Sequence, residues 1–543
     1  MTYTGNELTP ELKQAEEEID NYYKSNPLVK LPFTTAVWSF FAFVEDYMLI
    51  RTMQIDGKQD IYVLGSEFLV ELEYSIAWLY SACQPDGQVS FNFHNDHYKA
   101  SMDLFELGKK YESFVFAYTC ANHGWIDLNV KEFSIQPTGN FFKNFEYEAY
   151  NVLIDASLFS EASSAINFNN FPIDAIERSL KVRGDRFRYK LNPRMVSNTI
   201  AFLKPLFDQI FSLPNEWRFS RYSLGDFRQV FEAICSIAHI HWKARKMAVT
   251  RGCGSMAHLD SIYLPTCDEL LRRVVRYSGV SNAKVKNILD DLTYGNSSIS
   301  HSELAMRPLI KLNSEYYAIV PHVWICSSAE RNFAALLNRL KCERKIYLKL
   351  VSSEREDLMR QRFTEGLSDK GYRFICGNVT NLTDVDLAIV NDSEKTCLLL
   401  ELKWFIAPTV ARERIEKSEE IEKGISQVLE LQQAFADNHR PLLDKLNIDS
   451  NYRLEGVVVS QNWIGYANAQ SPEVPVIRVD HLIAKLKAAE SLQSTIEWLK
   501  DREYLPKEGE HFKIVDGDPL TICNWSLITP EVELLVHDTF FPL

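Results

Sequence analysis

The sequence lacks several patterns that would assign it to a class at once. No two of its ten cysteines lie closer than 14 positions, which excludes a CxxC zinc ribbon and a dense disulfide framework. Its longest apolar stretch, 35–44, is interrupted by Ser39 and falls well short of the ~20 residues that span a bilayer. The first 20 residues are acidic and polar, unlike a secretory signal. We therefore expect reduced thiols in a soluble, cytoplasmic protein without membrane contact.

The composition is that of a globular protein with more than one core. A chain of 543 residues suggests about two to four domains. The balance of 46% apolar and 24% charged residues excludes global disorder, a collagen-like repeat and a coiled-coil rod. Two histidine pairs, His94/His97 and His239/His241, have no nearby cysteine and no HExxH context. We expect these histidines to have structural or surface roles rather than to bind a metal.

The net charge of −14 is unevenly distributed. Residues 1–180 carry 11 basic and 26 acidic side chains, whereas residues 181–251 carry 14 basic and 5 acidic ones. Alternate residues of a strand share a face, so part of the stretch 181–194 would form a cationic row if it is a strand. Two interpretations remain open: the row binds phosphates, or it docks on the acidic N-terminal region. The candidate nucleic-acid contacts here are Arg183, Arg186, Arg188 and Lys190.

Most of the N-terminal half reads as helical. An acidic helix is predicted at 10–23, a buried aromatic segment at 36–44 and a helix at 61–82. Residues 195–250 also look helical, and the residues expected to break them are Pro205, Pro214 and Gly225.

Residues 268–292 read as helix, short turn, helix. The turn is 278–281, where Ser281 is a plausible N-cap, and two strands of a wing would follow around an Asn313-Ser314 turn. This pattern resembles a helix-turn-helix with a wing. The second helix carries Lys284 and Lys286 as candidate nucleic-acid contacts, but the same unit also occurs as a structural or dimerisation module, and both roles stay open.

Residues 343–490 carry the strongest chemical signal. A helix is predicted at roughly 345–370, ended by Gly371, and is followed by a strand at 373–376. A loop then runs into a second strand within 383–390, and the polar turn 391–395 leads to an apolar strand at 397–404.

Three charged residues of these strands are predicted to converge. Glu401 and Lys403 are two apart, so they share one face of their strand, and a hairpin would place Asp386 beside them. Asp386 and Glu401, with the backbone carbonyl of Leu402, offer hard oxygen ligands for Mg²⁺. Lys403 would orient a water or stabilise charge at phosphorus. The trio therefore predicts metal-assisted hydrolysis of a phosphodiester.

Here the sequence resembles the PD-(D/E)XK nuclease superfamily, which has the restriction-endonuclease-like fold. The resemblance rests on Asp386 and on the run Glu401-Leu402-Lys403, in a segment of fewer than a third of the residues. It implies a catalytic glutamate on the preceding helix and a Gln or Lys on the next. The implied residues are Glu356, with Glu354 and Asp357 as rivals, and Gln427, with Lys423 one turn earlier.

The order of the remaining elements agrees with this resemblance, with one departure. Strands are predicted at 454–460 and 474–479 and a helix at 481–489. However, no proline precedes the aspartate. Asp384 shares a face with Asp386, so the ligand assignment could shift between the two.

We therefore expect a multidomain α+β protein whose C-terminal α/β domain has a central mixed sheet of the restriction-endonuclease-like type. A winged-helix-like module and a largely helical N-terminal region would precede it. The expected regions are an acidic one at 1–180, a basic helical one at 181–260, the winged-helix-like module at 261–340, the nuclease-like domain at 341–500 and an acidic C-terminal segment, packing on the body, at 501–543.

The expected activity is that of a Mg²⁺-dependent endonuclease, for which Mn²⁺ should substitute. Nucleic acid is the expected partner, with DNA favoured over RNA, and the resemblance suggests a prokaryotic defence, restriction or DNA-processing role. A homo-oligomer that responds to a signal through the N-terminal region is a further possibility. The rival hypothesis is a regulatory protein that binds nucleic acid without cleaving it and uses the nuclease-like domain as a scaffold.

Overall fold

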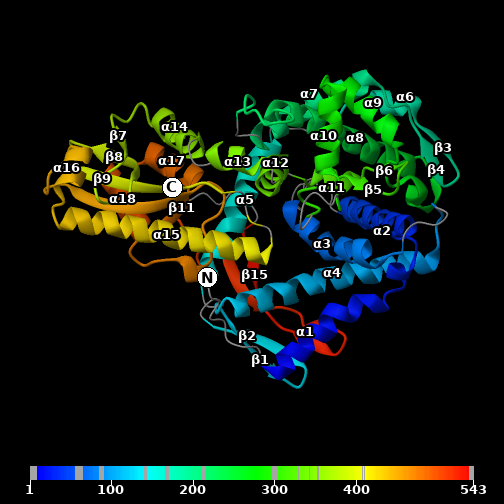
Figure 1. Cartoon of the computed structure of the whole chain (residues 1–543), viewed down its shortest axis with the longest axis horizontal. Helices are drawn as coiled ribbons and strands as arrows, with labels where there is room; N and C mark the ends of the chain where they lie inside the picture. The colour runs from blue at the N-terminus through cyan, green and yellow to red at the C-terminus, as the bar shows by residue number, and fades with distance from the viewer. Residues whose placement is uncertain are drawn as a thin grey trace.

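The computed structural model mixes α helices with parallel and antiparallel strands (Figure 1). It describes residues 9–54, 65–84, 91–139, 144–164, 170–210, 214–295, 303–327, 329–340, 343–350, 354–405, 408 and 410–536. Two predicted helices, 61–82 and 345–370, each extend partly over positions outside the described residues. The expected α+β class and the expected mixed sheet are both observed.

The N-terminal region is a set of packed helices. They are α1 (Pro10–Tyr22), η1 (Tyr23–Ser25), η2 (Pro27–Lys30), α2 (Phe33–Gln54), α3 (Gly65–Ala82) and α4 (Asn95–Asn122). Pro10 stands at the first position of α1, and Thr9 caps it by accepting a hydrogen bond from the backbone N–H of Leu12 at 3.3 Å. The buried aromatic segment predicted at 36–44 lies within α2.

Helix α2 is long and apolar enough to cross a membrane, but 83% of its most apolar window is buried inside the protein. Its two acids, Glu45 and Asp46, are themselves buried and pair with basic side chains of the middle region. This burial is that of a core helix and agrees with the expectation of no membrane contact.

The C-terminal segment joins a sheet with the N-terminal region. In this four-stranded sheet β2 pairs antiparallel with β1, and β14 runs parallel to β2. Its strands, in spatial order, are β1 (Asp127–Lys131), β2 (Ser134–Thr138), β14 (Trp525–Leu527) and β13 (Leu520–Ile522). A separate antiparallel pair consists of β12 (Phe512–Asp516) and β15 (Pro530–Leu534).

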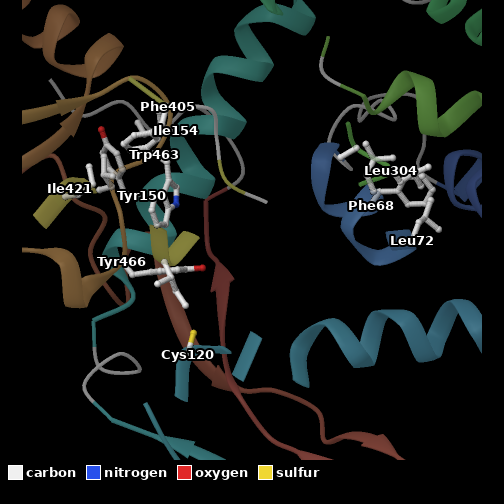
Figure 2. Close-up of a cluster of buried hydrophobic side chains, with 14 of the residues drawn as sticks. Phe68, Leu72, Cys120, Tyr150, Ile154, Leu304, Phe405, Ile421, Trp463 and Tyr466 are labelled. Atoms are coloured by element: carbon white, nitrogen blue, oxygen red, sulfur yellow. The ribbon is translucent and has the colours of Figure 1, made fainter. Parts of the chain in front are cut away.

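Helix α5 (Glu146–Ser164) joins the N-terminal part to the C-terminal part. The hydroxyl of Tyr150 lies 3.0 Å from Nδ1 of His481, and Asn151 Oδ1 accepts a hydrogen bond from the backbone of Ile464 at 3.0 Å. Figure 2 shows Tyr150 and Ile154 among Phe405, Trp463 and other buried side chains of that cluster. One continuous apolar core therefore contains residues from both ends of the sequence.

Glu148, on the same helix, is a buried carboxyl group. The residue as a whole is half-buried, yet both side-chain oxygens are buried and have no hydrogen-bond partner among the described residues. Burial raises the pKa of Glu148 to about 8, and repulsion from Glu146 adds to this, while Arg414 opposes it. The folded protein therefore holds a proton on Glu148 at pH values where the unfolded chain has lost it.

This pKa predicts that the free energy of unfolding falls as pH rises from about 5 to about 8, because the unfolded state binds fewer protons than the folded state in that range. This group should contribute a slope of at most about 1.4 kcal/mol per pH unit. Glu148→Gln should remove that component, as measured by urea unfolding at several pH values. The exposed Glu132→Gln is the control. An unchanged pH profile in Glu148→Gln would contradict the prediction.

The middle region is again mainly helical. Its elements are α6 (Asp174–Ser179), β3 (Lys181–Arg183), β4 (Arg186–Arg188), α7 (Pro193–Ile210), α8 (Leu224–Thr250), η6 (Gly254–Asp260), α9 (Cys267–Ser278), α10 (Asn282–Leu292), β5 (Ile310–Lys311), β6 (Tyr317–Ala318), α11 (Pro321–Ile325) and α12 (Ala329–Arg339). The predicted helix-turn-helix is thus present as α9 and α10, and β5 pairs antiparallel with β6.

Three local predictions in this region need correction. Pro205 does not break a helix: it lies on the exposed face of α7, whose opposite face buries Leu203 and Phe207. This burial outweighs the ~3 kcal/mol that an interior proline costs. Ser281 occupies the N-cap position of α10, but its side chain forms no cap hydrogen bond. Lys190 lies beyond the end of β4, so only Arg186 and Arg188 continue the cationic row on that strand.

The C-terminal part contains a five-stranded mixed sheet in the order β11-β10-β9-β8-β7 (Figure 1). Strand β8 pairs antiparallel with both β7 and β9, whereas β9, β10 and β11 are mutually parallel. The strands are β7 (Arg373–Gly377), β8 (Val385–Asn391), β9 (Thr396–Lys403), β10 (Arg453–Ser460) and β11 (Val476–Arg478). Strand β9 lies in the middle of the sheet, where both of its faces are covered. This position explains why its sequence is mainly apolar and why its residues are buried up to Leu402.

Helices cover both faces of this sheet. They are α13 (Arg344–Leu350), α14 (Glu356–Gly366), α15 (Ala411–Ala436), α16 (Arg440–Leu446), η8 (Ala467–Ala469), α17 (Val479–Ala488) and α18 (Leu492–Lys500). The single helix predicted at 345–370 is wrong in its extent: α14 ends at Gly366, one turn before Gly371, which has a φ of +69° in the turn that follows. Met359 and Phe363 of α14 are buried against the sheet, as predicted.

Candidate active site

The candidate site forms where β8 and β9 separate. The antiparallel ladder between them ends at the pair Leu387–Leu400. One residue further on, the Asp386 carboxylate accepts a hydrogen bond from the backbone N–H of Leu402 at 2.8 Å. Because the N–H and C=O of a strand residue point to the same side, the Leu402 carbonyl is also directed towards β8. The structure therefore places Asp386 beside Glu401, as the hairpin predicted.

Lys403 connects the strands to helix α15. Its Nζ lies 2.6 Å from Oε1 of Glu401 and donates a hydrogen bond to Oε1 of Gln427 at 3.0 Å. The Gln427 amide in turn donates to the hydroxyl of Thr383, in the loop before β8, at 3.1 Å. A continuous chain of hydrogen bonds therefore orients the ammonium group from two elements, and the predicted Gln427 is part of it.

Glu356 approaches from the first turn of α14. Burial raises the pKa of Glu356, and repulsion from Asp386 adds to this, while Glu356 in turn raises the pKa of Glu401, so the three carboxyl groups repel one another. Arg360, one turn on, donates to the backbone carbonyl of Asp386 at 3.3 Å. The rival Asp357 is 69% exposed and pairs with Arg360 at 2.7 Å, and so points away from the sheet.

The sequence also left open whether Asp384 or Asp386 is the main metal ligand. Asp384 is exposed and precedes the first residue of β8, whereas Asp386 is half-buried and bonded to β9. Asp384 influences the site only through its charge, which raises the pKa of Asp386. The geometry therefore selects Asp386 as the aspartate that meets Glu401 and Lys403.

The carboxyl groups are held in an environment that opposes their charge. Burial raises the pKa of Glu401 to about 7, repulsion from Asp386 adds to this, and Lys403 opposes it. Burial also raises the pKa of Asp386, although the Leu402 N–H and Lys403 act in the opposite direction. A cation beside these oxygens would relieve the repulsion.

The donor set fits a hard divalent cation. Asp386, Glu401 and the Leu402 carbonyl supply only oxygen, and Mg²⁺ commonly takes one or two carboxylates and keeps several waters. Within the described residues no group of three or more His, Cys, Asp or Glu side chains lies close enough to hold a metal on its own. The oxygen donors present fit a hard ion that keeps several of its waters.

The site residues differ in how far they are exposed. The Glu401 side chain is 4% exposed, Lys403 is 19% exposed and Glu356 is 38% exposed. Exposure thus increases from the sheet outwards.

Gly424, which was not anticipated from the sequence, lets α15 pass directly over the charged residues. A Cβ at this position would lie 2.7 Å from Cε of Lys403 and 3.3 Å from Cγ of Glu401. A glycine inside a helix costs up to ~1 kcal/mol relative to alanine, so a glycine among good helix formers was the available signal.

We expect Gly424→Ala to displace the Lys403 ammonium from Gln427. If the site hydrolyses phosphodiesters, as the sequence predicts, cleavage should fall by about 10²-fold, because small misplacements of a catalytic group have effects of this size. The measurement is single-turnover cleavage at saturating metal. Ala434→Gly in the same helix is the control for a general effect on α15, although it acts on stability in the opposite direction. Full activity in Gly424→Ala would contradict the prediction.

A second feature that sequence reasoning missed is a stack of Arg355 on Trp404. Arg355 is 2% exposed, and its guanidinium lies 3.4 Å from the ring centroid of Trp404 and 5.9 Å from that of Trp217. Arg355 precedes Glu356, and Trp404 follows Lys403. Trp217 belongs to the core of the middle region. The stack therefore connects the backbone beside Glu356 and Lys403 to that core.

The predicted nucleic-acid contacts do not gather at this site. Arg183, Arg186 and Arg188 lie on β3 and β4, at the opposite end of the molecule from β9 (Figure 1). Lys190 is exposed just after β4. Lys284 pairs with Asp226 at 2.8 Å, while Lys286 is exposed on the same helix.

We compared the chain with known protein families, curated proteins and solved structures. No protein-family model, no curated protein and no solved structure matches the chain.

Proposed function

We propose that this protein is a metal-dependent nuclease that hydrolyses phosphodiester bonds at the site formed by Asp386, Glu401 and Lys403. The observation that carries the proposal is their convergence where β8 and β9 separate, with Lys403 held by Gln427. The mixed sheet β11-β10-β9-β8-β7, flanked by α14 and α15, supports a restriction-endonuclease-like domain. Roles in restriction, antiviral defence or DNA processing fit such an activity.

Each residue has a distinct task in this proposal. Asp386, Glu401 and the Leu402 carbonyl would hold a Mg²⁺ or Mn²⁺ ion, which when bound acidifies water and neutralises phosphate charge. Lys403 donates a hydrogen bond to the attacking water or to a phosphate oxygen, where negative charge develops. Gln427 keeps the ammonium in place through its 3.0 Å hydrogen bond. Glu356, the most exposed carboxylate, is placed to accept a proton from water.

The test distinguishes cleavage of a nucleic acid from binding without cleavage. The full chain is incubated with supercoiled DNA, linear duplex DNA and single-stranded RNA, with Mg²⁺, with Mn²⁺ or with EDTA. We expect nicking or cutting with either ion and none with EDTA, and the substrate panel decides between DNA and RNA. Tight binding of these substrates without cleavage in either ion would instead support the non-cleaving regulatory protein and overturn the proposal.

A further inference from the structure

A two-stranded hairpin in the middle region carries a row of cations on one face. The register pairs Lys181 with Arg188 and Arg183 with Arg186, so all four side chains share that face. The alternate residues Val182 and Phe187 form the other face, and Phe187 is buried. We call the four side chains the cationic face.

The hairpin is held firmly by its apolar side. The Phe187 ring lies 5.5 Å from that of His241 on α8, and the backbone N–H of Phe187 donates to Asp260 at 2.8 Å. The hydroxyl of Tyr189, just after β4, lies 3.1 Å from Nδ1 of His241. The cations therefore project from a fixed platform.

Little on the protein neutralises the cationic face. Among the described residues, only Arg186 of the four forms an ion pair, with Asp260 at 3.0 Å. The carboxylate of Asp185, in the hairpin turn, lies against Gly254. Docking of this row on the acidic N-terminal region, one of the two interpretations of the sequence, is not observed among the described residues.

This arrangement costs stability unless an anion covers it. Like charges directly opposite on neighbouring strands destabilise the pair, and both cross-strand pairs here are cation on cation. The protein as a whole has a net charge of −14, so its overall field does not favour polyanions, and the local row must provide the attraction.

We propose that the cationic face is a second binding surface for the phosphate backbone of a polynucleotide, separate from the candidate active site. The identity of the ligand rests on the proposed nuclease function. Arginine suits phosphate because its planar guanidinium donates two parallel hydrogen bonds. The apolar residues of the hairpin face inwards, as expected for backbone recognition but not for insertion into a membrane surface.

The position of the hairpin determines what kind of substrate uses it. It lies at one end of the molecule, and β9 and α15 lie at the other (Figure 1). A single polynucleotide that engages both must run along the molecule. Long substrates should therefore bind more tightly and with a steeper salt dependence than short ones.

The experiment compares the double variant Arg183→Gln/Arg188→Gln with wild type in EDTA, so that binding is measured without cleavage. The probes are labelled DNA and RNA duplexes of about 60 base pairs, on the order of 200 Å at 3.4 Å per pair. The control, Lys131→Gln/Arg440→Gln, removes two exposed cations elsewhere. Loss of two phosphate contacts should lower the slope of log K against log salt by about 2 in the double variant alone.

The outcomes separate this inference from the proposed function. If wild type cleaves but the double variant keeps the wild-type affinity and salt slope, the cationic face does not bind the substrate, while the nuclease proposal stands. If the slope falls but no metal supports cleavage, the binding surface stands and the nuclease proposal fails. Binding of wild type to phosphatidylserine vesicles, with no binding to either duplex, would overturn the inference.

Discussion

Asp386→Asn should abolish metal-dependent cleavage while leaving the fold intact, with a loss of at least about 10³-fold. The amide oxygen of asparagine can still accept the 2.8 Å hydrogen bond from Leu402, so the junction of β8 and β9 is preserved. What is lost is the negative charge that would hold the cation. Lys403→Ala should produce a loss of similar size, because it removes the donor that Glu401 and Gln427 keep in place.

The matched control for these variants is Asp392→Asn. Asp392 follows β8 at its other end, where its carboxylate accepts hydrogen bonds from Arg373 and Tyr452 on the surface, so Asp392→Asn removes a partnered carboxylate away from the site. Cleavage is measured under single-turnover conditions in Mg²⁺ and Mn²⁺, and circular dichroism checks the fold. If Asp386→Asn and Lys403→Ala cleave as fast as the control, the catalytic assignment is wrong.

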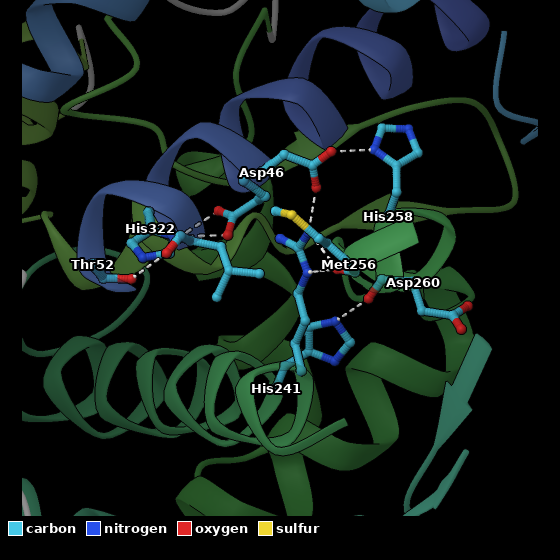
Figure 3. Close-up of polar contacts among 10 residues, drawn as sticks. Asp46, Thr52, His241, Met256, His258, Asp260 and His322 are labelled. Carbon is cyan, nitrogen blue, oxygen red and sulfur yellow. Dashed lines mark hydrogen bonds and ion pairs between the residues drawn. The ribbon is translucent and has the colours of Figure 1, made fainter. Parts of the chain in front are cut away.

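Arg245→Met should destabilise the protein by about 3–5 kcal/mol, because it leaves a buried carboxylate without its charged partner. Arg245, on α8, is 1% exposed and pairs with Asp46 of α2, which also accepts a hydrogen bond from Nδ1 of His258 at 2.7 Å (Figure 3). Beside it, Glu45 pairs with His322 at 2.6 Å. These contacts fix the long apolar helix α2 to the middle region.

Arg245 also stabilises an unfavourable backbone. Its Nε and Nη2 donate to the carbonyl of Met256 at 3.2 and 3.0 Å, within the run Ser255–Ala257, where φ is 46°, 51° and 54°. Left-handed conformations of this kind cost roughly 1–2 kcal/mol per residue. Part of the expected destabilisation therefore comes from releasing this segment.

The measurement is urea unfolding followed by tryptophan fluorescence. Arg440→Gln, which breaks an exposed pair with Asp444, is the control and should cost at most about 0.5 kcal/mol. The double variant Arg245→Met/Asp46→Leu should recover part of the loss, because it removes the unpaired buried carboxylate, while the buried His258 loses its acceptor. An effect of Arg245→Met as small as that of the control would show that the buried pair does not support α2.

The sequence was most informative where structure depends on neighbours along the chain. The alternation of 397–404 placed Glu401 and Lys403 on one face, and the short turn before it placed Asp386 on the adjacent strand; the structure has both. The period of a strand and the length of a hairpin are local properties, and so they can be read without coordinates. Gln427, in contrast, was implied by the family resemblance and not by a local period.

Other features depended on contacts between distant segments. The end of the predicted 345–370 helix at Gly366, the continuation of α7 through Pro205 and the pairing of β14 with β2 were not anticipated. Each of these features depends on which surfaces are buried against each other. The spacing of residues within a single helix or strand does not contain that information.

The sequence by itself determined the types of element, the charged face of β9 and the oxygen-rich composition of the candidate site. Tertiary structure alone decided that Gly424 makes room for Lys403, that Arg355 stacks on Trp404, and that the cationic face lies at the far end of the molecule. The physical reason is that side-chain periodicity is set by backbone geometry within a few residues. Which faces meet is set by the burial of apolar surface summed over the whole chain.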